Sequence, residues 1–122
     1  MSILAPFRRF FSRVAESDEQ RYAEEIEEWC SSIPGTVRIR EAAPRTRVKL
    51  AGVVRRITIR PLEDNESLEA LLDDGTGEVT VVWMGRRSIP GLNLGTHLIV
   101  EGLLAEQRGE RRIVNPRFEF GA

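Results

Sequence analysis

The sequence predicts a mainly β fold, a small barrel of five strands preceded by a helical extension. After residue 35, apolar residues alternate with polar ones in short runs, as they do in half-buried strands. Glycine-containing turns separate these runs. Before the turn-forming triplet Ile33-Pro34-Gly35, apolar residues recur with helical spacing instead. We therefore expect residues 1–34 to form a helical extension and residues 35–122 to form the barrel.

Two separate helices are expected in the extension. The first has one apolar face, made by Phe7, Phe10, Phe11 and Val14. The second is predicted from Asp18 to Cys30, because Ser17 and Gln20 have the spacing of a capping box; its apolar stripe is Tyr22, Ile26, Trp29 and Cys30. Residues 1–14 have three open roles: capping the barrel, pairing with a second copy or a protein partner, or lying on an anionic membrane. With three arginines in this short segment, we favour packing or partner contact, so a homodimer or a protein partner through these helices fits the sequence.

The longest predicted strand covers residues 47–59. Its apolar residues lie at even positions up to Val54 and at odd positions from Ile57. A change of parity within one strand indicates a β-bulge, and Gly52 lies near it. A strand bent in this way can serve both sides of a small barrel.

The other strands are shorter and are bounded by turns. The turn Asp73-Asp74-Gly75-Thr76-Gly77 joins two of them, and its aspartates suit local backbone hydrogen bonding better than metal binding. Asn115-Pro116 interrupts the last strand, which we therefore expect to be an edge or bulged segment. The expected strands are residues 68–72, 79–83, 98–104 and 113–120.

Composition limits the chemistry. The chain has 122 residues, 18 basic and 19 acidic residues, and a net charge of −1. One cysteine and one histidine cannot make a disulfide or a zinc site, and no nucleotide, metalloprotease or serine-nucleophile motif is present. We expect Cys30 to be a buried, inert thiol and His97 to be a surface residue at the start of a strand. We expect neither enzymatic activity, nor a cofactor, nor a metal, nor a membrane span, and we predict a cytoplasmic protein.

Four phrases occur in order that resemble a known family: VKLAGVVRRITIRP, LDDGTGEVTVVWMG, LGTHLIVEG and NPRFEF. Over residues 46–120 the chain resembles the OB domains of the tRNA-anticodon and helicase-wedge type, as in class II aminoacyl-tRNA synthetases and RecG helicases, and short stand-alone actinobacterial OB proteins. The resemblance implies a Greek-key OB barrel that binds single-stranded or structured DNA or RNA. It also implies that the ligand lies across strands two and three, between the loops at residues 60–67 and 106–111.

Arginine supplies the candidate binding residues, because all but one of the basic residues are arginine. The candidates are Arg47, Lys49, Arg55, Arg56, Arg60, Arg86, Arg87, Arg108, Arg111, Arg112 and Arg117, with Trp83 as a stacking surface. The alternation around Trp83 favours an inward position in the core, as it does for Phe118 and Phe120 in the core or at an edge. The alternative for the arginines is an ordinary solvated surface, and Glu63, Asp64 and Glu66 in the first loop oppose phosphate binding.

Two functions follow from these observations. The first is non-catalytic binding of nucleic acid by the barrel. The second is a protein-interaction or regulatory module that uses the barrel and the N-terminal helices.

Overall fold

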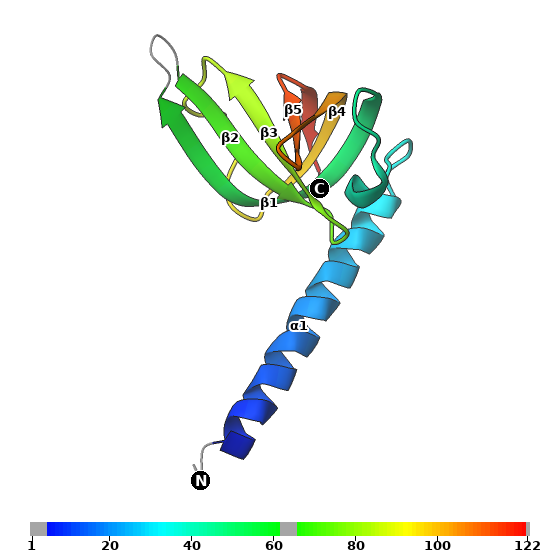
Figure 1. Ribbon diagram of the computed structural model, residues 1–122, viewed down its shortest axis with the longest axis vertical. Coiled ribbons are helices and arrows are strands. Elements are labelled where there is room, and N and C mark those ends of the chain that lie inside the picture. The colour runs from blue at the N-terminus through cyan, green and yellow to red at the C-terminus, as the bar shows by residue number, and fades with distance from the viewer. Residues whose placement is uncertain (1–4, 62–65, 122) are drawn as a thin grey trace.

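One long helix precedes a curved β-sheet in this protein (Figure 1). The computed structural model describes residues 5–61 and 66–121, with side chains from residue 18 onward. Its elements are α1 (Ala5–Ser31), the 3-10 turn η1 (Ile39–Glu41), β1 (Arg47–Pro61), β2 (Glu66–Asp73), β3 (Glu78–Met84), β4 (His97–Gln107), β5 (Glu110–Val114) and β6 (Arg117–Phe120).

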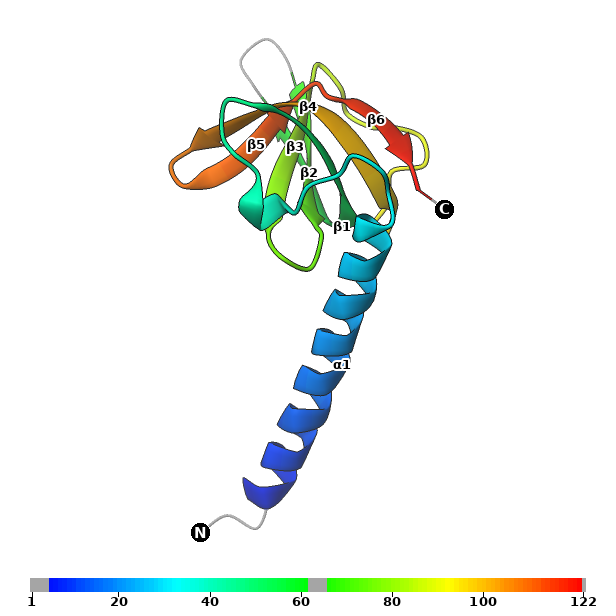
Figure 2. The same ribbon diagram turned by 90° about the vertical axis from the view of Figure 1, so that its right-hand side faces the viewer.

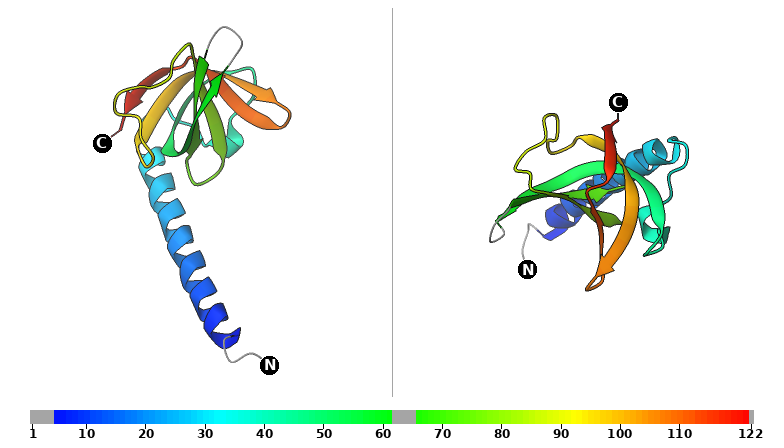
Figure 3. Two further views of the ribbon diagram at one scale, coloured as in Figure 1. Left: turned by 90° about the vertical axis from the view of Figure 1, so that its left-hand side faces the viewer. Right: turned by 90° about the horizontal axis from the view of Figure 1, so that it is seen from above.

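The sheet closes on itself, which confirms the predicted mainly β barrel. Its order is β1-β2-β3-β5-β4, and β1 pairs with β4 to complete the ring. Only the β3–β5 pairing among those described is parallel. The closed, curved sheet is visible from above in Figure 3. The predicted fifth strand is divided at Asn115-Pro116: β5 lies between β3 and β4, whereas β6 pairs with β4.

The predicted bulge in β1 is present, between Val54 and Arg56. It lies just past Gly52, where β1 moves from its pairing with β4 to its pairing with β2. A Cβ atom at Gly52 would lie 2.7 Å from the carbonyl oxygen of Asp73. Glycine is therefore required there, because the two strands approach too closely for any side chain.

The core lies inside the barrel, and a smaller apolar cluster lies outside it. Inward residues such as Leu50, Leu72 and Val81 are fully buried. Outside, Ile26 and Cys30 of α1 pack against the outer face of β1 and β4, on Ala51, Val53 and Ile99. The middle of β1 is thus buried on both faces. Only the last turns of the helix take part in this described cluster, and the rest of α1 projects away from the barrel (Figure 2).

The prediction of two separate helices is wrong, because α1 runs without a break from Ala5 to Ser31. No glycine or proline lies between Phe7 and Ser31, so nothing in the backbone ends the first helix. Residues 18–20 lie on the exposed surface of a continuous helix, where polar residues are as favourable as they are at the start of a helix. The side chains of residues 1–14 lie outside the described ones, so the expected packing or partner contact of this segment stays a prediction.

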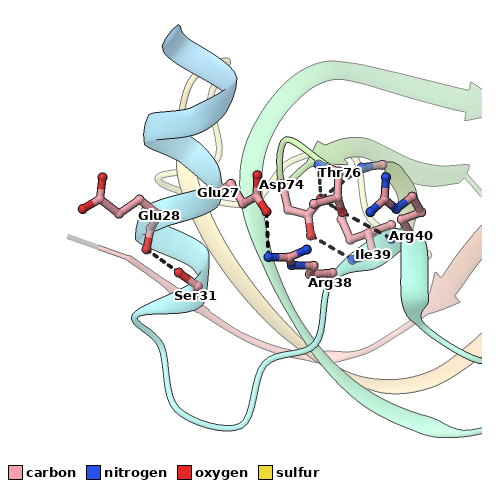
Figure 4. A network of polar contacts seen from close by, with 9 residues as sticks. Glu27, Glu28, Ser31, Arg38, Ile39, Arg40, Asp74 and Thr76 are labelled. Atoms are coloured by element: carbon pink, nitrogen blue, oxygen red, sulfur yellow. Dashed lines mark hydrogen bonds and ion pairs between the residues drawn. The ribbon is translucent and has the colours of Figure 1, made fainter. Parts of the chain in front are cut away.

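Asp74 ties the β2–β3 turn to η1, in addition to its predicted role in the turn (Figure 4). The side chain is 2% exposed. Its Oδ1 accepts hydrogen bonds from Thr76 N (2.9 Å), Thr76 Oγ1 (2.7 Å) and Gly77 N (3.1 Å), and its Oδ2 accepts one from Ile39 N (2.8 Å). An ion pair of 3.1 Å between Arg38 and Glu27 joins the same region to α1.

Cys30 is buried, as predicted, and its Sγ donates to the carbonyl oxygen of Ala51 (3.2 Å). Burial, together with the negative charges of Asp74 and Asp73, raises the pKa of the thiol to about 12. The thiol is therefore protonated and unreactive at neutral pH. No helix in the described part of the chain is long and apolar enough to cross a membrane.

Candidate nucleic-acid interface

A polar groove runs across the outer face of β1, β2, β3 and β5. It consists of two adjoining hollows of about 630 and 510 Å³, which share Arg60, Glu69, Glu110 and Arg112. The remaining lining residues of the larger hollow are Arg56, Thr58, Leu71, Gly77, Glu78, Thr80, Gly109 and Arg111. Those of the smaller one are Ser67, Val82, Met84, Gln107 and Arg108. The groove therefore crosses the face between the end of β1 and the β4–β5 turn, where the sequence resemblance places the ligand.

The bulge decides which side chains of β1 face this groove. Up to Val54 the even-numbered residues point into the barrel, whereas after the bulge Ile57 packs against the core and the even-numbered residues line the groove. Arg56, Thr58 and Arg60 are thereby placed on the outer face, opposite the outward residues of β2. If the strand alternated regularly through Arg55, this stretch would present isoleucine to the groove instead.

Glu69 lies in the middle of the groove, and the sequence analysis did not single it out. The residue is 7% exposed. Its Oε2 lies 2.8 Å from Arg60 Nε and its Oε1 lies 3.9 Å from Arg112 Nη1. A carboxylate is tolerated at this depth because two guanidinium groups compensate its charge. The signal available in the sequence was its outward parity on β2, between Leu68 and Ala70.

Five of the eleven predicted basic residues converge on the groove: Arg56, Arg60, Arg108, Arg111 and Arg112. Arg60 and Arg112 are bound to Glu69, whereas Arg56, Arg108 and Arg111 form no ion pair with any described residue. Arg111 donates from Nη2 to the carbonyl oxygen of Arg40 (2.9 Å), which leaves its other N–H groups free for a ligand.

The other predicted basic residues lie outside the groove. Arg47 and Lys49 are in the part of β1 that pairs with β4, and Lys49 Nζ donates to the Pro34 carbonyl oxygen (3.0 Å). Arg55, the bulge residue, pairs with Asp73 (3.6 Å) and lies over the ring of Tyr22. Arg86 is exposed in the loop after β3, and Arg87 pairs with Glu66 (2.7 Å). These residues therefore lie on the solvated surface or bind neighbouring groups of the protein, and none of them lines the groove.

Trp83 does not offer a stacking surface. It is 4% exposed and lies in the barrel core, its ring edge-on to Phe118 with centroids 5.4 Å apart. The inward position predicted from alternation is confirmed, and the proposed contact with a base is wrong, because a base cannot reach the ring. Phe118 and Phe120 lie on β6, at the edge, and both are exposed. None of the described residues that line the groove is aromatic.

The histidine and the acidic residues considered in the sequence lie away from the arginines of the groove or outside the described residues. His97 begins β4, as predicted, with its ring 4.5 Å from that of Trp29. Glu66 belongs to β2 rather than to the first loop, and Glu63 and Asp64 lie outside the described residues. The described part of the chain contains no group of three or more acidic, histidine or cysteine side chains arranged to hold a metal ion.

The barrel is similar to three solved structures. RecG bound to a three-way DNA junction superposes with a TM-score of 0.60 and 18% identity over 69% of this chain. The HINb domain of p204 gives 0.56 and 21% over 70%, and a replication protein A heterotrimer bound to ssDNA gives 0.50 and 20% over 62%. No protein-family model matches the chain. No curated protein matches it either.

The chain spans only part of each of these proteins: 12% of the RecG chain, 57% of the replication protein A chain and 47% of the p204 chain. The strand order, the single parallel pairing within the described ring and the groove across β2 and β3 agree with the architecture of OB barrels. This chain therefore has the OB fold.

Proposed function

We propose that the protein binds single-stranded or structured nucleic acid in the groove across β2 and β3, without catalysing a reaction. The observation that carries the proposal is the convergence of five arginines, from β1, β5 and the β4–β5 turn, on one groove. Three glutamates also line the groove, but the five arginines outnumber them. The groove is therefore positive, although the net charge of the whole chain is −1. Such a local field attracts phosphates even where the whole molecule does not.

The position of the groove supports the proposal. OB barrels bind oligonucleotides on the face of strands two and three, between the β1–β2 and β4–β5 loops. The similar structures of RecG and replication protein A are described as bound to a DNA junction and to ssDNA, respectively. The two hollows adjoin, so the groove continues from the residues around Arg56 and Gly77 to those around Ser67 and Met84.

A binding role without catalysis fits the placement of the reactive side chains. The thiol of Cys30 is buried beneath α1, and His97 lies on β4 against Trp29, so neither lines the groove. The groove supplies guanidinium, carboxylate and hydroxyl groups, which recognise phosphates and base edges.

The test is fluorescence anisotropy with labelled single-stranded DNA, single-stranded RNA, duplex DNA and a three-way junction, at low and moderate salt. We expect binding that weakens with salt, since phosphate contacts release counterions. In the double variant Arg56→Glu/Arg111→Glu, affinity at low salt falls by about tenfold or more. The matched control Arg47→Glu/Arg117→Glu reverses two charges outside the groove and changes affinity little. Absence of binding at low salt by the folded wild type would refute the proposal.

A protein partner is the second candidate, and the exposure of α1 favours it. The helix projects from the barrel, and most of its residues from Asp18 to Glu25 are exposed, including Tyr22. An exposed helix with an acidic surface suits a basic protein surface. Wild-type protein that binds none of the four nucleic acids, yet forms a complex that the Tyr22→Ser variant does not, would favour this function.

A further inference from the structure

The five groove arginines differ in their partners, and we propose that this difference divides their roles. Arg60 and Arg112 present the flat faces of their guanidinium groups to bases, whereas Arg56, Arg108 and Arg111 contact phosphates. This inference rests on the proposed function, since it assigns which part of the nucleic acid each side chain meets.

The first step is the geometry around Glu69. A guanidinium group donates hydrogen bonds in its own plane, so a carboxylate at its edge leaves both faces free. Arg60 is held in this way, by Nε at 2.8 Å from Glu69 Oε2, while 64% of its side chain remains exposed. Arg112 approaches Oε1 of the same carboxylate and is 24% exposed. Glu69 is anchored on β2 and buried, so it holds the guanidinium of Arg60 over the centre of the groove and attracts that of Arg112 to the same place.

The second step is charge. The carboxylate of Glu69 offsets the positive charge of Arg60 and Arg112 and repels a phosphate that approaches them. Turning either arginine toward a phosphate would also leave Glu69 buried with less compensation, which is unfavourable. Arg56, Arg108 and Arg111 form no ion pair with a described carboxylate. The phosphates of a bound strand are therefore directed to the flanks and its bases to the centre.

The third step is what the groove lacks. Proteins that bind single strands stack bases on aromatic rings or on arginine planes. None of the described lining residues is aromatic, and Trp83 lies in the core. The two arginines paired with Glu69 are the flat polar surfaces that remain, with Leu71 and Val82 beside them as the apolar floor.

The experiment compares lysine variants, because lysine keeps the charge and loses the plane. We expect Arg60→Lys/Arg112→Lys to weaken binding to a single-stranded DNA by about tenfold, without changing the slope of affinity against salt. The matched control Arg56→Lys/Arg111→Lys keeps affinity within about threefold. Conversely, Arg56→Ala/Arg111→Ala lowers the salt slope by about 1.4, which corresponds to two phosphates of a single strand.

A second probe separates stacking from charge. An abasic strand of the same length has the phosphates but no bases, so Arg60→Lys/Arg112→Lys should bind it as well as the wild type does. Equal losses on both strands, or no loss on the base-bearing strand, would overturn the inference. Wild-type protein that binds neither strand at low salt would instead refute the proposed function itself. Thermal unfolding checks each variant, and Arg60→Lys alone, at a largely exposed side chain, repeats the test if the double variant is unstable.

Discussion

Replacing Asp74 by asparagine would test how the β2–β3 turn is joined to η1. The asparagine side chain has the same shape, but one of its two polar atoms is a donor rather than an acceptor. Oδ1 accepts three hydrogen bonds from Thr76 and Gly77, whereas Oδ2 accepts one from Ile39 N. The amide oxygen will therefore take the place of Oδ1, and the amide NH2 group will face the N–H of Ile39.

The expected cost follows from these contacts. A hydrogen bond to a charged group contributes about 1.5–3 kcal/mol, and Ile39, which is completely buried, would keep an N–H without an acceptor. The three remaining bonds would also weaken, because their acceptor becomes neutral. We expect Asp74→Asn to lower the free energy of unfolding by about 3 kcal/mol and Tm by about 10 °C.

Urea denaturation at neutral pH measures this free energy, and hydrogen exchange measures protection of the Ile39 amide. The control is Asp73→Asn, because Asp73 accepts one turn hydrogen bond from Gly75 N (2.8 Å) and its ion pair with Arg55 is partly exposed. Its expected cost is below about 1 kcal/mol. Equal loss of stability in the two variants, or full protection of the Ile39 amide in Asp74→Asn, would contradict this assignment of the hydrogen bonds.

Two further predictions concern stability. The pKa of Cys30 is raised from 9.0 to about 12 in the folded state, so above pH 9 the thiol ionises in the unfolded chain alone. Between pH 9 and pH 12 the free energy of unfolding of the wild type therefore falls by about 1.4 kcal/mol per pH unit more than that of Cys30→Ala. Urea titrations at pH 8 and pH 10 should show an extra loss of about 1.4 kcal/mol, and parallel falls would contradict the assignment. Gly52→Ala costs about 2–3 kcal/mol, because its Cβ meets the backbone of Asp73 at 2.7 Å. Gly102→Ala, whose Cβ meets the flexible end of Ile113 at 3.1 Å, costs less than about 1 kcal/mol; calorimetry of both variants checks the order.

The strands could be predicted because their signals are local. Alternation placed Leu68, Val81 and Trp83 inside the barrel, and the change of parity in β1 revealed the bulge. The turn at Asp73–Gly77 and the interruption at Asn115-Pro116 depend on backbone preferences of the residues themselves. The helix boundary failed because Ser17 to Gln20 has the same composition as an exposed helical surface, so a capping box could not be told from a solvated turn.

The groove could be predicted only in part. The arginines were visible in the sequence, but their sorting depends on strand register and on which carboxylates lie nearby. Thr58 lies directly opposite Glu69, and Arg60, two residues further along β1, points to the same face and reaches the carboxylate diagonally. This register is set by the bulge. Arg55 forms an ion pair with Asp73, and Arg87 forms one with Glu66. Neither of these two arginines lines the groove. Such pairings join residues from different strands, and single-sequence periodicity carries no information about them.

The bulge at Arg55 makes the length of β1 as important as its composition. Deleting Arg55 would only remove the bulge, because Val54 and Arg56 already lie opposite consecutive residues of β2, and every residue beyond it would keep its face. One codon inserted between Arg56 and Arg60 would instead reverse the faces of the residues that follow it and turn Arg60 away from the groove. Insertions and deletions among descendants of this sequence are therefore expected to collect in the segment between β3 and β4, where no strand pairing has to be kept in register.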